Sequence, residues 1–242
     1  MTGTLVWISG ASGGIGRALA DTLPWADSRV IDISRSGAEG LEHVAADLSS
    51  RSGWQTAADS FAKELDGFEG ERALFIHCSA TLQPIGFAGE VDGEAYIDQV
   101  VLNSAAPQVL GDAFVRAVAG RDLEAHIVVM TSGAATSVYP GWSAYCAGKA
   151  AVEHWVRTVG AERAQRGDRC RVIAVAPGTV ATAMQERIRE TDPEDFPNVD
   201  KFIEKYERGE LRDPRDAARG IWEVLGRDLD NGAVVDLRDL GL

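Results

Sequence analysis

A tyrosine and a lysine four residues apart, in the stretch GWSAYCAGKAA at residues 141–151, are the first candidates for chemistry in this sequence. Residues at this spacing on a helix lie on the same face and can contact one another or a shared ligand. The ammonium group of Lys149 would favour the phenolate form of Tyr145, whose ordinary pKa is about 10. Such a pair suits proton transfer. It also occurs by chance on amphipathic helices, so other residues must decide its role.

A second candidate is the glycine-rich turn SGASGGIG at residues 9–16, which lies between an apolar run and a helical pattern. Gly10, Gly14 and Gly16 would let the backbone approach a pyrophosphate. The following helix would offer its free N–H groups and the positive end of its dipole. The spacing G-x-x-x-G-x-G differs from the usual G-x-G-x-x-G fingerprint. Its position between a strand and a helix therefore carries the prediction of a phosphate site.

Six short β-branched runs alternate with longer helical patterns and would position these residues. The runs cover residues 4–9, 28–34, 73–78, 125–131, 171–177 and 232–236. Apolar runs with little polar alternation are typical of parallel strands that helices cover on both faces. The sequence thus predicts an α/β fold with one doubly wound parallel sheet, as a single domain over residues 1–242. Residues 185–214, rich in charge and proline, would form either a flap over a site or a solvated helical hairpin.

Composition limits the partners and the location. The formal net charge of −13 disfavours nucleic acid and anionic lipid, so a small-molecule partner is expected. The first residues show no basic segment followed by a long apolar one, and no apolar run reaches about 18 residues. Neither a signal peptide nor a membrane anchor is therefore expected, and a cytoplasmic location is. Three scattered cysteines, Cys78, Cys146 and Cys170, predict neither a disulfide framework nor a zinc site, and no metal is expected.

Five motifs together resemble the short-chain dehydrogenase/reductase family. They are SGASGGIG, YCAGK, a serine thirteen residues before Tyr145, Asn103 in VLNSAAP, and APGTVAT, in the family's order and spacing along essentially the whole chain. Within the family, GWSAYCAGKAA, FIHCSATL and GAVVDLRD look most like sepiapterin reductases and the related benzil reductases. The resemblance implies a Rossmann-like fold, hydride transfer with a nicotinamide cofactor, and a homodimer or homotetramer.

The resemblance also implies roles for four catalytic candidates. Tyr145 would protonate the carbonyl oxygen of the substrate, and Ser132 would hold and polarise that carbonyl. Lys149 would favour the tyrosinate and bind the nicotinamide ribose, and Asn103 would hold a water that connects the lysine to solvent. Taken alone, Ser132 could be a turn residue at a strand end and Asn103 a polar residue inside a helix.

The end of the second strand bears on the choice of cofactor. In the family, an acid at this place binds the ribose of NAD, whereas a small residue followed by arginine accommodates the phosphate of NADP. Ser34 and Arg35 align there and predict NADPH or NADP, since a guanidinium binds phosphate well. Asp32 shares a strand face with Ser34 and would favour NAD if the strand ended sooner. The cofactor contacts implied by the resemblance are Gly10, Ser12, Gly14, Ile15, Gly16, Ser34, Arg35, Asp47, Ser79, Ala80, Tyr145, Lys149, Pro177, Gly178, Val180 and Thr182.

The predicted substrate contacts are Ser132, Trp142 and Asp236. Asp236 resembles the aspartate with which sepiapterin reductases anchor a pterin, and it could equally be an ordinary aspartate at a strand end. Trp142 and Tyr139 would line an aromatic pocket or serve packing alone. The substrate itself is not fixed by these residues.

One stretch departs from the family pattern. Where the family carries Asn-Asn-Ala-Gly after its fourth strand, this chain has His77, Cys78, Ser79 and Ala80. The bracing role of the asparagine is therefore in doubt, and Ala80 adds a methyl group close to the expected cofactor. A catalytic cysteine–histidine pair is not expected, because adjacent strand residues point to opposite faces.

The favoured function is that of an NADPH-dependent carbonyl reductase acting on a ketone or dicarbonyl, reversible as an alcohol dehydrogenase. The alternatives are an NAD-dependent alcohol dehydrogenase and a nucleotide-sensing protein without turnover. The presence of Ser132, Tyr145, Lys149 and Asn103 favours an enzyme, because a sensor needs no proton relay. A hydrolase is disfavoured, since no G-x-S-x-G motif follows a strand.

Overall fold

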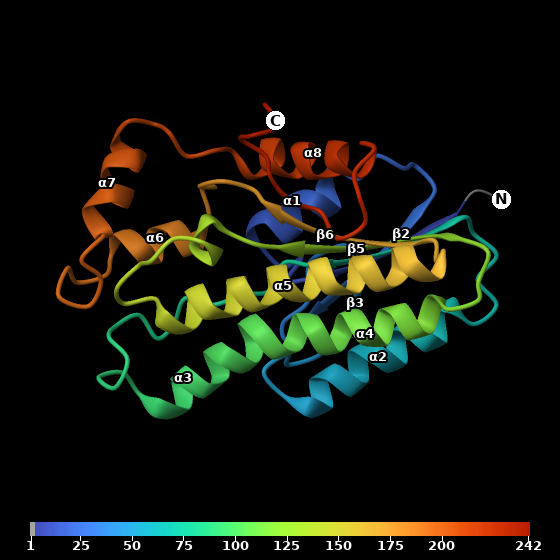
Figure 1. Cartoon of the computed structure of the whole chain (residues 1–242), viewed down its shortest axis with the longest axis horizontal. Coiled ribbons are helices and arrows are strands. Elements are labelled where there is room, and N and C mark those ends of the chain that lie inside the picture. Colours follow the sequence, from blue (N-terminus) through green and yellow to red (C-terminus); the bar gives the residue numbers. More distant parts are fainter. Residues whose placement is uncertain (1–2) are drawn as a thin grey trace.

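A seven-stranded parallel sheet forms the centre of the protein (Figure 1), as described by a computed structural model covering residues 3–242. The strands are β1 (Thr4–Ser9), β2 (Ser28–Ser34), β3 (Glu42–Ala45), β4 (Arg72–His77), β5 (Glu124–Met130), β6 (Cys170–Ala176) and β7 (Val234–Asp236). Their spatial order is β3-β2-β1-β4-β5-β6-β7. The order reverses between β1 and β4, which opens a crevice at the carboxyl ends of these strands. The predicted doubly wound α/β fold is confirmed.

Helices cover both faces of the sheet (Figure 1). On one face lie α2 (Arg51–Leu65), α4 (Ala106–Val118) and α5 (Ser143–Arg166), and on the other α1 (Gly14–Asp21) and α8 (Pro214–Leu225). Helix α3 (Gly93–Val100) joins α4 through a π-helical turn at Val101–Ala105, and a 3₁₀ turn at Gly133–Ala135 precedes α5. Helices α6 (Ala183–Arg189) and α7 (Val199–Glu207) extend past the carboxyl end of the sheet. Within residues 3–242, no helix is long and apolar enough to cross a bilayer.

Strand β1 illustrates why the strand sequences lack polar alternation. Leu5 and Trp7 enter the core beneath α2 and α4, whereas Val6 and Ile8 enter the core beneath α1 and α8. All four side chains are fully buried, and the indole N–H of Trp7 donates to Ser60 Oγ at 3.1 Å. Because each face of the sheet is covered, both sets of side chains must be apolar.

Two parts of the chain differ from the sequence-based prediction. Strand β3 was not predicted: it has four residues, pairs with β2 alone and carries the exposed Glu42 and His43, so it lacks an apolar run. The segment 185–214 is not a plain solvated hairpin, because its side chains Ile188, Phe196 and Phe202 are buried in an apolar cluster with Trp142 and Tyr145. The single domain predicted over 1–242 stays a prediction, and Met1 and Thr2 lie outside the described residues.

Candidate active site

A cavity of about 750 Å³ opens at the carboxyl ends of the strands. The loops after β1, β2, β4, β5 and β6 line it, together with the start of α5 and residues of α6 and α7. Asn103 alone among the predicted site residues is not part of its wall. Those that line it are Gly10, Ser12, Gly14, Ile15, Gly16, Ser34, Arg35, Asp47, Ser79, Ala80, Ser132, Trp142, Tyr145, Lys149, Pro177, Gly178, Val180, Thr182 and Asp236.

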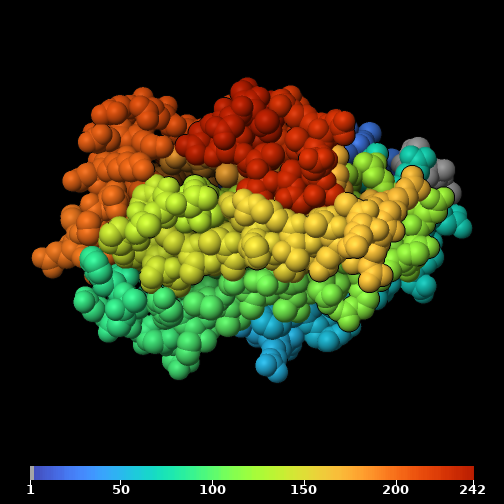
Figure 2. Space-filling model, viewed as in Figure 1, coloured from blue at the N-terminus to red at the C-terminus, as the bar shows by residue number. Residues whose placement is uncertain are grey.

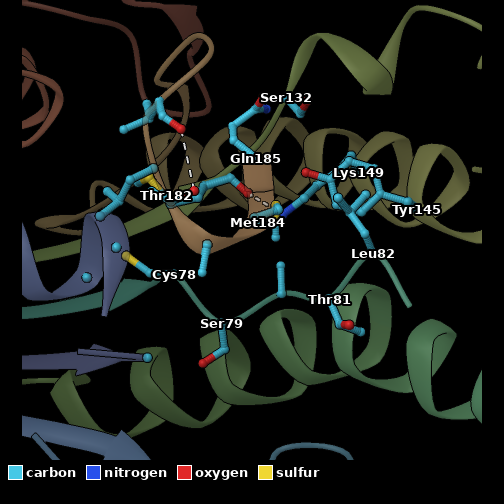
Figure 3. Close-up of a pocket in the computed structure, with 18 of the residues that line it drawn as sticks. Cys78, Ser79, Thr81, Leu82, Ser132, Tyr145, Lys149, Thr182, Met184 and Gln185 are labelled. Atoms are coloured by element: carbon cyan, nitrogen blue, oxygen red, sulfur yellow. Dashed lines mark hydrogen bonds between the residues drawn. The ribbon is translucent and has the colours of Figure 1, made fainter. Parts of the chain in front are cut away.

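The three proton-bearing candidates meet on one side of this cavity (Figure 3). Helix α5 carries Tyr145 and Lys149, and the loop after β5 carries Ser132. Lys149 Nζ lies 5.6 Å from the centroid of the Tyr145 ring and donates to the carbonyl of Met130 at 2.8 Å. Ser132 Oγ accepts from the Ala134 N–H at 3.2 Å, which leaves its own proton to donate. Two hydroxyl donors and an ammonium group can therefore face one bound carbonyl.

Burial governs the protonation of the tyrosine and the lysine. It raises the pKa of Tyr145 to about 12, an effect that the Ser132 hydroxyl opposes, and it lowers the pKa of Lys149 to about 8. Desolvation by burial is the largest influence on the pKa of Tyr145 in this structure, and Lys149 is not among the groups that shift it. Tyr145 keeps its proton at neutral pH. That is the form a general acid needs in order to protonate a carbonyl oxygen.

Asn103 lies in the π-helical turn and is buried. Its amide N–H donates to the carbonyl of Thr81 at 2.7 Å, and its Oδ1 accepts from the Thr81 N–H at 2.9 Å. Gln99, one turn earlier, donates to the carbonyl of Leu82 at 2.8 Å. These two amides fix the backbone of the loop after β4, which forms one wall of the cavity. In this structure the Asn103 side chain is therefore a positioning group.

The glycine-rich turn fits a phosphate group. Helix α1 begins at Gly14, and its N-cap, Gly13, offers no side-chain cap, so N–H groups of the first turn remain free where this turn lines the cavity. Gly10 has a φ of 75°, a conformation that favours glycine. A Cβ atom on Gly16 would lie 2.3 Å from the carbonyl oxygen of Gly10. The close approach of helix and loop therefore requires glycine.

Gly16→Ala is expected to push α1 away from this loop and to weaken dinucleotide binding by about 10-fold or more, with a lower midpoint of thermal unfolding. Gly13→Ala is the matched control for stability, because a Cβ atom there meets nothing within 4 Å and the φ of −169° suits any residue. Calorimetric titration with NADPH and thermal melts measure both effects. Unchanged affinity in Gly16→Ala would contradict the tight packing described here.

The polar residues at the end of β2 have different surroundings. Asp32 is fully buried, and its carboxylate accepts from the Ala11 N–H at 3.0 Å and the Ser34 hydroxyl at 2.6 Å. Ser34 and Arg35 line the cavity, whereas Asp32 does not. The Arg35 side chain is exposed and has no carboxylate within 4.0 Å among residues 3–242. A guanidinium without a carboxylate partner among these residues therefore borders the cavity, whereas the Asp32 carboxylate is held inside the protein.

The stretch that departs from the family pattern has its own bracing. Ser9 Oγ accepts from the backbone N–H groups of Cys78 and Ser79, both at 3.1 Å, and lies 3.0 Å from His77 Nδ1. The serine hydroxyl thus connects β1 to the end of β4, at the stretch where the family carries a bracing asparagine and this chain does not. Burial raises the pKa of the Cys78 thiol to about 12, which leaves it protonated and unsuited to nucleophilic chemistry.

His77 is expected to make the protein sensitive to acid. Burial, with Lys149 adding repulsion, lowers the pKa of His77 from 6.5 to about 3. In the unfolded chain the imidazole takes up a proton near pH 6.5, so stability is lost as the pH falls from 6.5 toward 3. Linkage sets this loss at about 2 kcal/mol between pH 7 and pH 5. Chemical denaturation at several pH values measures the free energy of unfolding. Its dependence on pH should be flatter in His77→Asn than in wild type, and unchanged in His154→Asn, which alters an exposed histidine. The same pH dependence in all three proteins would refute this.

Asp236 lines the cavity, but its carboxylate is bound by a residue that the sequence analysis missed. The Arg238 guanidinium donates from Nε to Asp236 Oδ1 at 2.9 Å and from a second nitrogen to Oδ2. This pairing holds the pKa of Asp236 below its usual range. The Asp236 carboxylate is therefore already paired with a guanidinium in this structure, rather than free to meet the edge of a pterin. The spacing of opposite charges in Asp236-Leu237-Arg238 was the available signal for the pair.

An aromatic wall stands beside Tyr145. The Trp142 ring stacks on Phe196 at 4.3 Å with an angle of 9° between planes, and it lies 5.7 Å from the Tyr145 ring. Tyr139 lies 5.1 Å from Trp142. Both Tyr139 and Trp142 line the cavity and belong to the apolar cluster at the same time. They combine packing with a surface that suits an apolar substrate.

Known proteins resemble this chain in sequence and in fold. A family model described as short chain dehydrogenase matches residues 4–193. Benzil reductase ((S)-benzoin forming) of Bacillus cereus is 30% identical over 91% of this chain and 93% of its own. Sepiapterin reductase of Rattus norvegicus is 31% identical over 96% of this chain and 95% of its own. The crystal structure of the KRED1-Pglu enzyme superposes with a TM-score of 0.82, at 23% identity, over 96% of this chain and 100% of its own.

Proposed function

Since this chain belongs to the short-chain dehydrogenase family, we propose that it is an NADPH-dependent reductase of ketones or dicarbonyls. The chain is an NAD(P)-dependent oxidoreductase acting on CH–OH and C=O groups. The observation that carries the proposal is the meeting of Ser132, Tyr145 and Lys149 in one cavity with the glycine-rich turn. A cytoplasmic location and a homodimer or homotetramer stay predictions.

Bound NADPH would supply a hydride to the carbonyl carbon of the substrate. The hydroxyl groups of Ser132 and Tyr145 would donate to the carbonyl oxygen, whose negative charge grows during the reaction. Tyr145, protonated at neutral pH, would give up its proton to that oxygen. The Lys149 ammonium would then stabilise the phenolate that remains. Asn103 would keep the loop after β4 in place through its two hydrogen bonds to Thr81.

The choice of NADPH rests on Arg35 and Asp32. The unpaired guanidinium of Arg35 at the cavity edge can bind the additional phosphate of NADPH. Asp32 would have to give up two buried hydrogen bonds to reach the ribose of NADH. The free N–H groups around Gly14 would hold the pyrophosphate, and Asp47 and Thr182 would contact the adenine and the carboxamide.

The aromatic wall and the relatives guide the choice of first substrates. Trp142 and Tyr139 beside Tyr145 suit a substrate with an apolar or aromatic body. The relatives named as benzil and sepiapterin reductases favour benzil, sepiapterin and similar dicarbonyls. Ser132 and Trp142 remain proposed substrate contacts, and Asp236, also predicted to bind the substrate, would act by positioning the Arg238 guanidinium.

The proposal is tested by the loss of NADPH absorbance in the presence of benzil, sepiapterin or diacetyl, with NADH in parallel. Turnover of at least one dicarbonyl, faster with NADPH than with NADH, is the expected result. Faster turnover with NADH would show that the assignment of Ser34 and Arg35 is wrong. Tight NADPH binding without turnover of any carbonyl would favour the nucleotide-sensing alternative.

A further inference from the structure

Apart from the proposed catalytic Lys149 and from Arg35 at the β2 end, three basic side chains line the cavity: Lys201 and Lys205 on α7, and Arg238 after β7. We call them the basic rim. The chain has four lysines, and three of them, Lys149 included, line this one cavity although the formal net charge is −13. Packing does not require this placement, because a lysine serves equally well on any exposed surface.

The two lysines of the rim have no carboxylate partner. Lys201 Nζ donates to the Tyr139 hydroxyl at 3.0 Å, and Lys205 Nζ donates to Thr179 Oγ1 at 3.1 Å. Both acceptors are neutral. Among residues 3–242 no carboxylate lies within 4.0 Å of either ammonium group, whereas most arginines on the surface are paired. Two positive charges without a carboxylate partner therefore border the cavity and are available to an anionic ligand.

The rim lies next to the reacting centre. The Arg238 side chain lies between Gly133, which follows Ser132, and Gly178. A Cβ atom added at either glycine would lie 4.0 Å (Gly133) or 3.7 Å (Gly178) from the nearest Arg238 side-chain atom. Lys205 reaches the residue after Gly178, and Lys201 reaches Tyr139, whose ring contacts Trp142 beside Tyr145. In Figure 2 the orange segment that contains α7 lies next to the red C-terminal segment.

The charge balance on this side of the cavity is positive. The acids that line the cavity are Asp47, Asp98 and Asp236. Asp236 is paired with Arg238, and Asp47 lies near Arg35 at the opposite end, where the adenine is expected. Of the acids that line the cavity, only Asp98 is left to offset the charges of Lys201 and Lys205. An anion that enters beside the aromatic wall would therefore meet an excess of positive charge.

We propose that the substrate of this protein carries an anionic carboxylate on an apolar or aromatic body, in addition to the reacting carbonyl. This inference rests on the proposed carbonyl reduction and specifies the substrate class. The apolar body packs on Trp142 and Tyr139, the carbonyl oxygen faces Ser132 and Tyr145, and the carboxylate binds at the basic rim. The extra phosphate of NADPH takes the other end of the cavity, at Arg35, so the rim is left for the substrate.

The test compares phenylglyoxylate, which bears a carboxylate, with its neutral methyl ester in wild type and in Lys201→Gln/Lys205→Gln. The measured quantity is the ratio of kcat/KM for the acid to kcat/KM for the ester, which cancels general losses of activity. Removal of both ammonium groups should lower this ratio about 10-fold. Lys63→Gln, which removes an exposed lysine outside the cavity, should leave the ratio unchanged. Thermal melts confirm that each variant is folded.

Binding gives a second readout that does not need turnover. Calorimetric titration of both compounds into Tyr145→Phe loaded with NADPH should show tighter binding of the acid, and the added double lysine substitution should abolish that preference. An unchanged ratio and an unchanged binding preference would overturn the proposal. A rise in the KM for NADPH with no change in ratio would assign the lysines to the cofactor phosphates and would also overturn it. If wild type reduces no carbonyl, the proposed function fails, and the binding preference still decides whether the rim selects an anion.

Discussion

Tyr145→Phe is expected to lower kcat for carbonyl reduction at least about a thousandfold, with little change in the affinity for NADPH. General acid catalysis contributes about 10²- to 10⁴-fold, and the phenol is also one of the two donors to the developing oxyanion. The buried ring keeps its packing against Trp142 after the substitution, because only the hydroxyl group is removed. Steady-state kinetics together with calorimetric titration of NADPH separate the chemical effect from binding.

Tyr96→Phe is the matched control for this substitution. The Tyr96 hydroxyl lies 3.1 Å from Ser143 Oγ, and the residue does not line the cavity. The control removes the same group from the same residue type, so its kcat should stay within about twofold of wild type. If Tyr145→Phe retained a tenth of the wild-type kcat, Tyr145 would not be the acid.

The second large effect concerns cofactor choice. Ser34→Asp/Arg35→Leu is expected to reduce the ratio of kcat/KM for NADPH to that for NADH by about 100-fold or more. The substitution removes the cation that would bind the additional phosphate and places a carboxylate where that phosphate would lie, and charge pairs of this kind carry several kcal/mol. The measurement is initial rate with each cofactor at a fixed carbonyl concentration.

Arg121→Leu serves as its control, since Arg121 is exposed after α4 and, among the described residues, its guanidinium donates only to the carbonyl of Ala117. Its cofactor ratio should equal that of wild type. A double variant that still preferred NADPH would mean that Arg35 does not read the phosphate. If the wild type preferred NADH, Asp32 would be the residue that binds the ribose, although its carboxylate already accepts two hydrogen bonds inside the protein.

Most of the fold could be predicted from the sequence, because the strands of a doubly wound sheet appear in it as short apolar runs. Strands covered on both faces must be apolar throughout, and six such runs mark six of the strands to within two residues. Strand β3 escaped notice since it lies at the sheet edge and is half exposed. Its residues Glu42 and His43 give it no apolar signature. In the charged segment 185–214, the buried residues Phe196 and Phe202 could not be predicted, because most of the residues around them are polar and solvated.

The site was predictable where one motif fixes a position, and not where distant segments meet. Tyr145 and Lys149 share one helix, so their spacing alone implied proximity. The pairing of Asp32 with the Ala11 N–H joins β2 to the glycine-rich turn, and no local pattern encodes it. The basic rim likewise brings Lys201 and Lys205 to Arg238, more than thirty residues away in sequence, and only the folded structure shows it.

The most direct test of the central claim follows a labelled hydride. The protein is incubated with NADPH that carries deuterium at the transferable position of nicotinamide C4 and with benzil, and the alcohol product is analysed by mass spectrometry and NMR. The account predicts one deuterium on the carbinol carbon, at a rate that falls at least about a thousandfold in Tyr145→Phe. Product without the label, or tight NADPH binding with no alcohol formed from any carbonyl substrate, would contradict it.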